Sequence, residues 1–580
     1  MARQGVLHPK AGAILMFFPG AGEISQMVTK IEESGAPAHW WVLQLHGALN
    51  AEEQQDAFKT TFPPGKTLKI IVCTNVAETS VTVPDVTVVI DTCRERRTGI
   101  DKDSSTAHLR EQYCAKDSLK QRRGRAGRVQ PGVCIRLLSR SKVEALTDKT
   151  DPEMKRVPLE NVYLQLCAIG VDNHSEFFKT TPDPPEESSV LIAKKTLEDL
   201  GALELGAPDG KHGLTPLGRH LAALPCHPRL GKMLILGCML GVPGPVLSIC
   251  SAMTGRSPMM TTQDTSKRSA WQTERQKLLK ALGHRSDHCA WAVLLHLWMH
   301  PDVARSVLCR KYGLSYERMQ AAFFERRHLC ESLSQAGFLP KDFLQTERAK
   351  EQGPPDWIVV CAAVAGGLFP NVAKASRSSR SASKVVGSSL GDRNRVMSYE
   401  VNQFHVTTYG RIDVGKTKKV CNMHPNSLCF GIDSFQYPLV AFYTLQQTKK
   451  LFVYDATEAS AWALLLFSGS APVWNEHLRC FVIGDWLSFS CDRGDFVGDF
   501  IDAARRAVQA VLERRLRDRS GDVSTAPELV AIVDLLRTHG LGFLPASHAE
   551  PSWPLLEQLC EESAPHMEQL RAERAEKEQA

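Results

Sequence analysis

Apolar and polar residues alternate along the first 140 positions in a pattern typical of a parallel sheet covered by helices. Four short apolar runs have the length and composition of buried strands: 13–18, 41–45, 68–73 and 86–91. Two stretches with helical spacing lie between the first three of these runs: 23–33 and 51–61. Because strands that alternate with helices fold into parallel sheets with crossover helices, this region is predicted to be an α/β domain.

Further along, from about residue 155 to 345, apolar residues recur three and four positions apart, which predicts helices. Segments with the composition of strands return after that: 357–364, 439–442, 451–453 and 486–489. They predict a small β-barrel. The Ser/Arg-rich stretch 374–395 has almost no large apolar residues, so we expect a mobile loop inserted in the barrel, with RNA binding or phosphorylation as alternative roles.

An amphipathic helix is expected over 501–519, where one stripe of apolar residues runs from Ile501 to Leu516. Arginines cover the remaining positions: Arg505, Arg506, Arg514, Arg515, Arg517 and Arg519. We expect them to form the solvated face of this helix, with RNA binding as the alternative.

Composition narrows the class of protein. A chain of 580 residues is too long for one core, and 43% apolar with 23% charged residues is ordinary for a soluble protein. No run of about 18 apolar residues is present, so no membrane span is expected. The 17 cysteines are scattered without any Cys-x-x-Cys pair, which indicates free thiols in a reducing compartment. We therefore expect a cytoplasmic protein, or alternatively a nuclear or mitochondrial one. Cys421, His424 and Cys429 lack a fourth ligand, so no metal site is expected.

The net charge of +6 is unevenly distributed, because residues 94–140 hold thirteen Lys and Arg against five Asp and Glu. This segment contains Gln121-Arg-Arg-Gly-Arg-Ala-Gly-Arg128, whose glycines allow close packing. Arg125 and Arg128 project from it, and a guanidinium group presents a planar fork of donors that fits phosphoryl oxygens. Such groups stabilise charge on a transferring phosphoryl group. The alternative is a solvated basic turn.

Three further motifs precede this one in a fitting order. They are Leu-Met-Phe-Phe-Pro-Gly at 15–20, a segment beginning Leu-His-Gly-Ala-Leu-Asn at 45–58, and Thr-Asn-Val-Ala-Glu-Thr-Ser-Val-Thr-Val-Pro-Asp at 74–85. The last one places hydroxyl and amide side chains directly after an apolar strand, where they can hold phosphates and ribose. Together the four motifs resemble the second RecA-like domain of DEAH/RHA-box RNA helicases. In this resemblance, 15–20, 74–85 and 121–128 correspond to motifs IV, V and VI.

The resemblance extends from about residue 13 to 540. Segments 156–159, 214–225 and 231–235 resemble the family's winged helix and helical bundle, and 365–373, 424–427 and 485–486 resemble its oligonucleotide-binding (OB) fold. It implies a multidomain chain with an α/β RecA-like parallel sheet, a winged helix and helical bundle, and a small OB-type β-barrel followed by a C-terminal helix. The implied domains are a second RecA-like domain at 1–145, a winged helix at 146–224, a ratchet-like helical bundle at 225–350, an OB fold at 355–500 and C-terminal helices at 501–580. Val83-Pro-Asp85 and the run Leu-Ala-Ala-Leu-Pro favour the member that assists ribosomal scanning in translation initiation.

The same resemblance implies roles for single residues. Arg125 and Arg128 would be arginine fingers on the γ-phosphate of ATP, and Gln121 would orient phosphate or the attacking water. Phe58 would stack on adenine and Thr82 would lie near the ribose.

Members of the family carry an acidic residue where this chain has Pro84, so Asp85, one position later, is the nearest candidate for the ribose. Thr74 would contact the RNA backbone. Arg94, Arg96 and Arg97 stand where the family has a strand-separating hairpin and would follow RNA phosphates, a solvated hairpin being the alternative.

By resemblance, the chain is therefore the C-terminal part of an ATP-dependent, 3′-to-5′ RNA helicase that remodels single-stranded RNA or an RNP such as the ribosome. No Asp-Glu-x-His box occurs in the sequence, so the Mg²⁺ ligands are expected on a first RecA-like domain upstream. This chain alone is therefore expected to be inactive in ATP hydrolysis. The competing hypothesis is an RNA- or ribosome-binding adaptor that does not hydrolyse ATP.

One segment, Gly410-Arg-Ile-Asp-Val-Gly-Lys-Thr417, satisfies the pattern of a phosphate-binding loop. Such a loop must open a helix, and Pro425 interrupts the residues that follow. We therefore expect a loop of the barrel at this position.

This interpretation predicts that Lys416→Ala leaves ATP turnover unchanged in any helicase that contains the chain, because Lys416 contacts no phosphate. A steady-state ATPase assay with and without RNA measures this. Turnover that disappears in the variant would restore the phosphate-loop interpretation.

Overall fold

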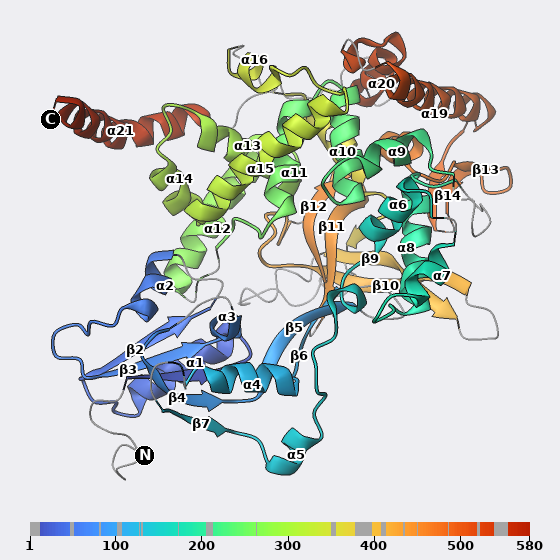
Figure 1. Ribbon diagram of the computed structural model, residues 1–580. Coiled ribbons are helices and arrows are strands. Elements are labelled where there is room, and N and C mark those ends of the chain that lie inside the picture. Colours follow the sequence, from blue (N-terminus) through green and yellow to red (C-terminus); the bar gives the residue numbers. More distant parts are fainter. Residues whose placement is uncertain are drawn as a thin grey trace. The chain divides into compact units, whose positions relative to one another are not determined.

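The computed structural model divides the chain into two compact units, Met1–Gly99 with His108–Val157 and Ile100–Ala107 with Pro158–Ala580. Each unit is described by itself (Figure 1). The structure describes these residues: 12–46, 51–79, 83–100, 107–126, 128, 131–171, 173–204, 213–260, 262, 264–349, 355–377, 397–407, 413–432, 435–448, 450–484, 486–492, 494–518, 522–538 and 555–579.

The first unit is built on a parallel sheet of five strands in the order β2-β3-β1-β4-β7. These strands are β1 (Ala13–Phe17), β2 (Trp40–Leu45), β3 (Leu68–Cys73), β4 (Val86–Asp91) and β7 (Val133–Arg136). The predicted parallel α/β domain and its four strands are confirmed. At the centre, Ile14 pairs with Ile70 on one side and with Val88 on the other.

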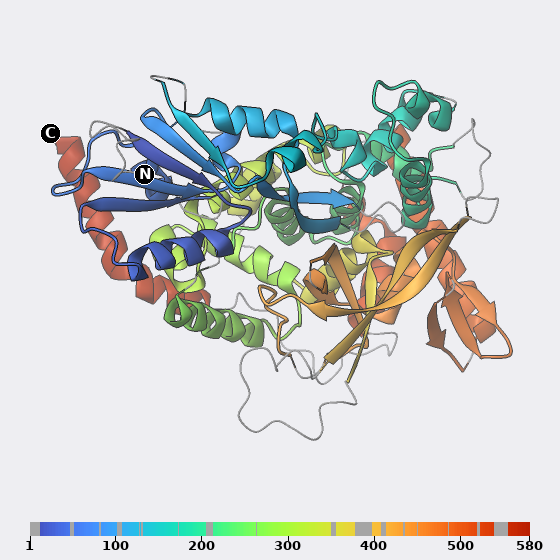
Figure 2. The same cartoon turned by 90° about the horizontal axis from the view of Figure 1, so that it is seen from below.

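Helices cover both faces of this sheet. On one face, α1 (Ala21–Glu33) buries Ile24 and Ile31 against Ile70 and Val72. On the other face, Leu15, Phe17 and Ile71 form a core with residues of α2 and α3. The remaining elements of the unit are α2 (Ala51–Phe58), α3 (Val76–Thr79), β5 (Arg94–Ile100), β6 (Ala107–Tyr113), α4 (Lys116–Gly124) and α5 (Arg140–Glu144). Figure 2 shows α1 and α4 on opposite sides of the sheet.

The second unit begins with helices, as the pattern after residue 155 predicts. The first group is α6 (Glu160–Ala168), α7 (His174–Lys179), α8 (Glu187–Leu200) and α9 (Pro216–Ala222). The second group is α10 (Pro228–Met239), α11 (Pro243–Thr254), α12 (Thr265–Leu282), α13 (Asp287–Met299), α14 (Arg305–Tyr312), α15 (Tyr316–Gln335) and α16 (Phe343–Ala349). Among the described residues, no helix is both long and apolar enough to cross a membrane.

The prediction of a strand over 357–364 is wrong, because α17 (Trp357–Leu368) occupies this segment. Its residues are almost all apolar, and periodicity cannot distinguish a buried strand from a helix that is buried on every side. The carboxylate of Asp356 accepts hydrogen bonds from the backbone N–H groups of Ile358 and Val359. This N-cap is the sequence signal that favours a helix.

The predicted barrel is confirmed, with five strands in the order β12-β10-β9-β8-β11 and closure between β11 and β12. The strands are β8 (Val372–Arg377), β9 (Met397–Thr407), β10 (Asp413–Met423), β11 (Leu439–Gln447) and β12 (Leu451–Glu458). Lys416 lies within β10, where it pairs with Phe404 of β9, so Gly415–Thr417 form part of a strand and not the expected barrel loop. The first residues of the Ser/Arg-rich segment belong to β8, and 378–396 lie outside the described residues.

The segment 486–489, expected in the barrel, belongs instead to a separate antiparallel sheet. That sheet contains β13 (Val473–Asn475), β14 (Cys480–Ile483) and β15 (Leu487–Ser490). The last helices of the chain are α18 (Ala461–Phe467), α19 (Gly494–Arg517), α20 (Pro527–Thr538) and α21 (Leu556–Gln579).

The expectation that the arginines of α19 form a solvated face is wrong for Arg505 and Arg515. Arg515 is buried, and Arg505 donates to the backbone carbonyls of Leu465 and Ser468 at 3.0 and 2.7 Å. These carbonyls lie at the end of α18, where free acceptors and the helix dipole favour a cation. Arg514 and Arg517 are exposed as expected, and Arg519 lies outside the described residues.

A second buried cation, Lys232 of α10, lies close to Arg505. Its Nζ donates to the backbone carbonyls of Leu200 and Phe467 at 2.8 and 2.6 Å. Leu200 is the last residue of α8, and Phe467 is the last residue of α18. Burial and the charge of Arg505 lower the pKa of Lys232 to about 7. Lys232 therefore joins two helix ends while it is close to losing its proton at neutral pH.

This pKa predicts a pH dependence of stability. Between pH 7 and 9, the unfolded chain keeps a proton on Lys232 that the folded chain has released, because the ordinary pKa is 10.5. Raising the pH should therefore stabilise the wild type relative to Lys232→Met by about 2 kcal/mol. Urea unfolding of both proteins between pH 7 and 9 measures the difference between their free energies of unfolding. The contributions of all other titrating groups cancel in this difference. Parallel stability curves would contradict the prediction.

Candidate phosphate-facing site

The ends of three strands that carry the predicted motifs of the first unit meet at one edge of its sheet. Phe17, Cys73 and Asp91 are the last residues of β1, β3 and β4, which run parallel. Thr74 follows β3 directly, and α3 and α4 pack against each other close to this edge. The carboxyl ends of parallel strands are where ligands bind in open α/β sheets.

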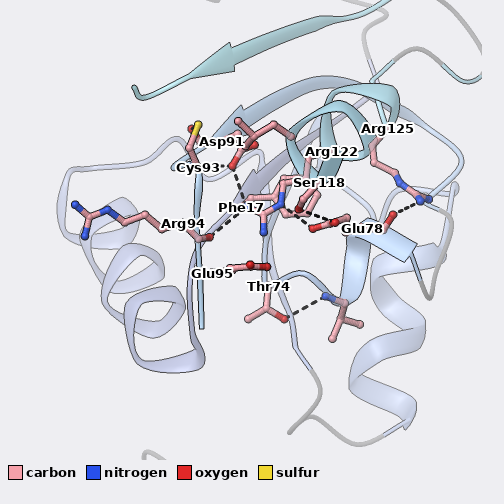
Figure 3. A network of polar contacts seen from close by, with 12 residues as sticks. Phe17, Thr74, Glu78, Asp91, Cys93, Arg94, Glu95, Ser118, Arg122 and Arg125 are labelled. Atoms are coloured by element: carbon pink, nitrogen blue, oxygen red, sulfur yellow. Dashed lines mark hydrogen bonds and ion pairs between the residues drawn. The ribbon is translucent and has the colours of Figure 1, made fainter. Parts of the chain in front are cut away.

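Arg122 is the centre of a polar network at this edge (Figure 3). Its side chain is fully buried, with Nε donating to the Glu78 carboxylate at 2.9 Å and Nη1 to the Asp91 carboxylate at 3.0 Å. Nη1 also donates to the carbonyl of Arg94 at 3.2 Å, and the guanidinium group lies 4.9 Å from the centre of the Phe17 ring. Burial by itself lowers the pKa of Arg122, but the acidic neighbours led by Asp91 raise it above its ordinary value. Arg122 therefore stays charged.

Glu78 joins α3 to α4 at three points. Its carboxylate accepts from Ser118 Oγ at 2.6 Å and from Arg122 Nε, and its backbone carbonyl accepts from Nη2 of Arg125. Neither Glu78 nor Arg122 was among the residues predicted for this site from the sequence. The available signals were the position of Arg122 one helical turn after the apolar Leu119 and the position of Asp91 at the end of an apolar strand.

The structure brings the two predicted finger residues together. Arg125 is the C-cap of α4 and is partly buried, while Arg128 is exposed. Burial and the positive charge of Arg128 lower the pKa of Arg125, whereas Glu78 raises it. Gln121 lies one turn earlier on α4 with an exposed side chain. Two guanidinium groups that repel each other form a place where an anion is favoured.

The residues predicted to hold the base and ribose are more dispersed. Phe58 ends α2 and packs partly against the core cluster of the sheet. Thr82 lies outside the described residues. The carboxylate of Asp85 is bonded to the buried Nζ of Lys69 at 3.2 and 3.3 Å, and the backbone carbonyl of Asp85 accepts from Ala13 N. Burial lowers the pKa of Lys69, and Asp85 raises it. Asp85 thus has a structural partner in this fold.

Each of the predicted RNA-facing arginines of β5 has an acidic partner. Arg94 pairs with Glu111, Arg96 with Glu23 and Arg97 with Glu95, at 2.6, 2.6 and 2.9 Å. These acidic partners, which come from β6, α1 and β5 itself, were not predicted from the sequence. RNA phosphates would have to share the arginines with them.

Two hydrogen bonds hold Thr74 in place. Its backbone N–H donates to the Leu45 carbonyl at 3.1 Å, and its Oγ1 accepts from the backbone N–H of Val76 at 3.5 Å. The hydroxyl therefore lies at the start of α3.

Four family models match successive parts of the chain. They are the helicase conserved C-terminal domain at residues 4–130, the winged-helix part of the helicase associated domain HA2 at 195–226, its ratchet-like part at 227–291 and an oligonucleotide/oligosaccharide-binding fold at 360–471. The chain belongs to the DEAH/RHA-box helicase family. The order of the matched segments is that of the family's C-terminal portion.

Individual DEAH/RHA-box helicases match over most of this chain. The Arabidopsis thaliana DExH-box ATP-dependent RNA helicase DExH1 is 30% identical over 536 residues, which are 91% of this chain and 49% of that protein. The rat ATP-dependent DNA/RNA helicase DHX36 is 27% identical over 93% of this chain and 51% of its own length. Xenopus laevis ATP-dependent RNA helicase dhx29 is 28% identical over 91% and 37%. The chain spans about half the length of the first two relatives and less of the third.

The helicase family uses ATP and Mg²⁺, and the chain's residues fit the phosphate end of a nucleotide. Arg125 and Arg128 supply paired positive charge beside the end of α4. Within the described ranges, no group of three or more His, Cys, Asp or Glu side chains could hold a metal ion.

The network predicts the effect of losing Arg122. In Arg122→Ala, the carboxylates of Glu78 and Asp91 lose their buried cation, so the free energy of unfolding of the first unit should fall by about 3 to 5 kcal/mol. Pulse proteolysis in urea measures this. Arg123→Ala is the matched control, because Arg123 is exposed on the same helix and should change stability by less than about 0.5 kcal/mol. Equal losses in both variants would contradict the assignment.

Proposed function

We propose that this chain is the C-terminal part of an ATP-dependent, 3′-to-5′ RNA helicase, in which its RecA-like domain supplies the arginine face of an ATP site. The observation that carries the proposal is the pair Arg125 and Arg128, of which Arg125 is bonded to Glu78 of α3 near the carboxyl edge of the sheet and Arg128 lies close enough to lower the pKa of Arg125. Family membership and the names of the relatives support nucleotide use. Glu78 and Arg122 hold the helix that ends at Arg125.

ATP, when bound, supplies a phosphoryl group whose transfer to water releases the free energy for movement along RNA. In this proposal, Arg125 and Arg128 stabilise negative charge on the γ-phosphate, and Gln121 orients phosphate or water. Phe58 is proposed to stack on adenine. The Mg²⁺ ligands are assigned to a first RecA-like domain.

RNA is the proposed substrate of the whole enzyme. The OB fold supports nucleic-acid binding, since such barrels bind single strands by stacking and backbone charge. Thr74 and the arginines of β5 are proposed as backbone contacts of the motor domain. Remodelling of an RNP, with the ribosome and translation as the favoured setting, rests on the motif resemblance. The proposed cytoplasmic location rests on the scattered cysteines, which indicate a reducing compartment.

This function predicts the phenotype of Arg125→Ala in an enzyme that contains this chain and its first RecA-like domain. Hydrolysis should fall by about 10³-fold, because the charge on the phosphoryl group loses a stabilising cation, while RNA affinity stays within about threefold. RNA-stimulated ATPase assays and RNA-binding titrations measure the two quantities. Arg123→Ala is the control: Arg123 lies two residues before Arg125 and is exposed, so the variant should leave both quantities unchanged.

Unchanged turnover in Arg125→Ala would refute the finger assignment. RNA binding without any hydrolysis by the wild-type enzyme would favour the adaptor hypothesis.

A further inference from the structure

Three contacts of Glu78 fall on one face of α4. They reach Ser118, Arg122 and Arg125, which are spaced by four and three residues and so lie along one stripe of a helix. The carboxylate of Glu78 holds the first two residues, and its backbone carbonyl holds the third. One residue of α3 therefore contacts α4 along the whole stretch that ends at Arg125.

The direction of the Arg125 side chain depends on this arrangement. Its Nη2 donates to the Glu78 carbonyl, so this acceptor moves whenever α3 moves. Because the carboxylate of the same residue is bonded to α4, the helix and the acceptor move together. Glu78 is bonded both to Arg122 in α4 and to Arg125 at the end of α4. These two bonds fix the direction of the Arg125 guanidinium group (Figure 3).

Helix α3 is only one turn long and starts directly after Thr74. The backbone N–H of Ala77 donates to the Thr74 carbonyl at 3.2 Å, and the N–H of Glu78 donates to the Asn75 carbonyl at 2.9 Å. No flexible segment separates Thr74 from Glu78. A displacement at Thr74 is therefore passed to Glu78.

A second connection leads from the same network to β5. Arg122 is bonded to Glu78 and also to the backbone carbonyl of Arg94, the first residue of β5. The turn at Thr74 and the strand β5 are the two proposed RNA-contacting elements. Both are therefore connected to the Arg122–Glu78 ion pair.

We propose that Glu78 is a positioning residue that sets the direction of Arg125 and thereby couples RNA contact at Thr74 to ATP hydrolysis. This inference rests on the proposed function for the roles of Thr74 and Arg125. In this proposal Glu78 contacts neither phosphate nor RNA and acts only through Arg125.

Two substitutions separate the effect of side-chain length at position 78 from the effect of side-chain charge. In Glu78→Gln the side chain keeps its length, and its amide can donate to Ser118 Oγ and accept from Arg122 Nε. In Glu78→Asp the charge stays, but the side chain is one methylene too short to reach both partners without moving α3. A positioning role predicts that Glu78→Asp is the more harmful variant, whereas a role in charge balance alone predicts the reverse.

The experiment measures ATP turnover in the two-motor enzyme with and without single-stranded RNA. We expect Glu78→Asp to lower kcat at saturating RNA by at least tenfold more than it lowers the turnover without RNA, with the KM for ATP within threefold of wild type. Glu78→Gln should retain most of the RNA stimulation. Asp91→Asn is the matched control, because it weakens the Arg122 ion pair without touching the Arg125 acceptor, and it should lower the Tm but preserve the ratio of stimulated to basal turnover.

Hydrogen exchange of the present chain gives a second readout that needs no ATPase activity. The amides of Arg125 and Ala126, bonded to the carbonyls of Arg122 and Arg123, should exchange at least tenfold faster in Glu78→Asp than in Glu78→Gln, with the amides of β4 unchanged.

Normal RNA stimulation in Glu78→Asp, or a larger loss in Glu78→Gln, would overturn the proposal. A wild-type enzyme without RNA-stimulated turnover would refute the proposed function together with the coupling. Unchanged exchange at Arg125 and Ala126 would refute the positioning of α4 in either case.

Discussion

A guanidinium group buried without exposure to water is the constraint on which the first unit depends. Removing such a charge from solvent is unfavourable unless ion pairs and hydrogen bonds replace the lost water. Arg122 meets this requirement with two carboxylates and one carbonyl, which come from α3, the end of β4 and the start of β5. Because all of these partners must be in place at once, the motif-bearing segments are held in one arrangement.

This arrangement explains how the chemical groups are distributed around α4. The same helix turns Arg122 inward and carries Arg125 at its C-terminal end. The inward arginine needs carboxylates, and one of these, Glu78, also provides the carbonyl that Arg125 contacts. The interactions that stabilise the fold and those that direct the candidate site are therefore shared.

The second unit uses buried charges in a similar way. Asp287, at the start of α13, accepts hydrogen bonds from Ser427 Oγ and from the backbone N–H groups of Leu428 and Ala456 at 2.6, 2.7 and 2.8 Å. It thereby attaches the helical bundle to the barrel. Burial raises the pKa of Asp287, and these hydrogen bonds lower it. Lys232 and Arg505 act at the ends of helices, so in both units buried charged side chains join elements far apart in the sequence.

The sequence by itself determined the parallel α/β domain, the presence of a barrel with two of its strands, β11 and β12, and the place of the arginine motif, because strand alternation and motif spacing are local properties. It could not determine that 357–364 forms a helix, because a continuous apolar run satisfies both structures. It also could not show which arginines are buried. Arg122, which is fully buried, and Arg505, which is partly buried, resemble their exposed neighbours until the carboxylates and carbonyls that surround them are known. Only the tertiary structure decides this, because the partners that make burial of a charge favourable come from distant segments.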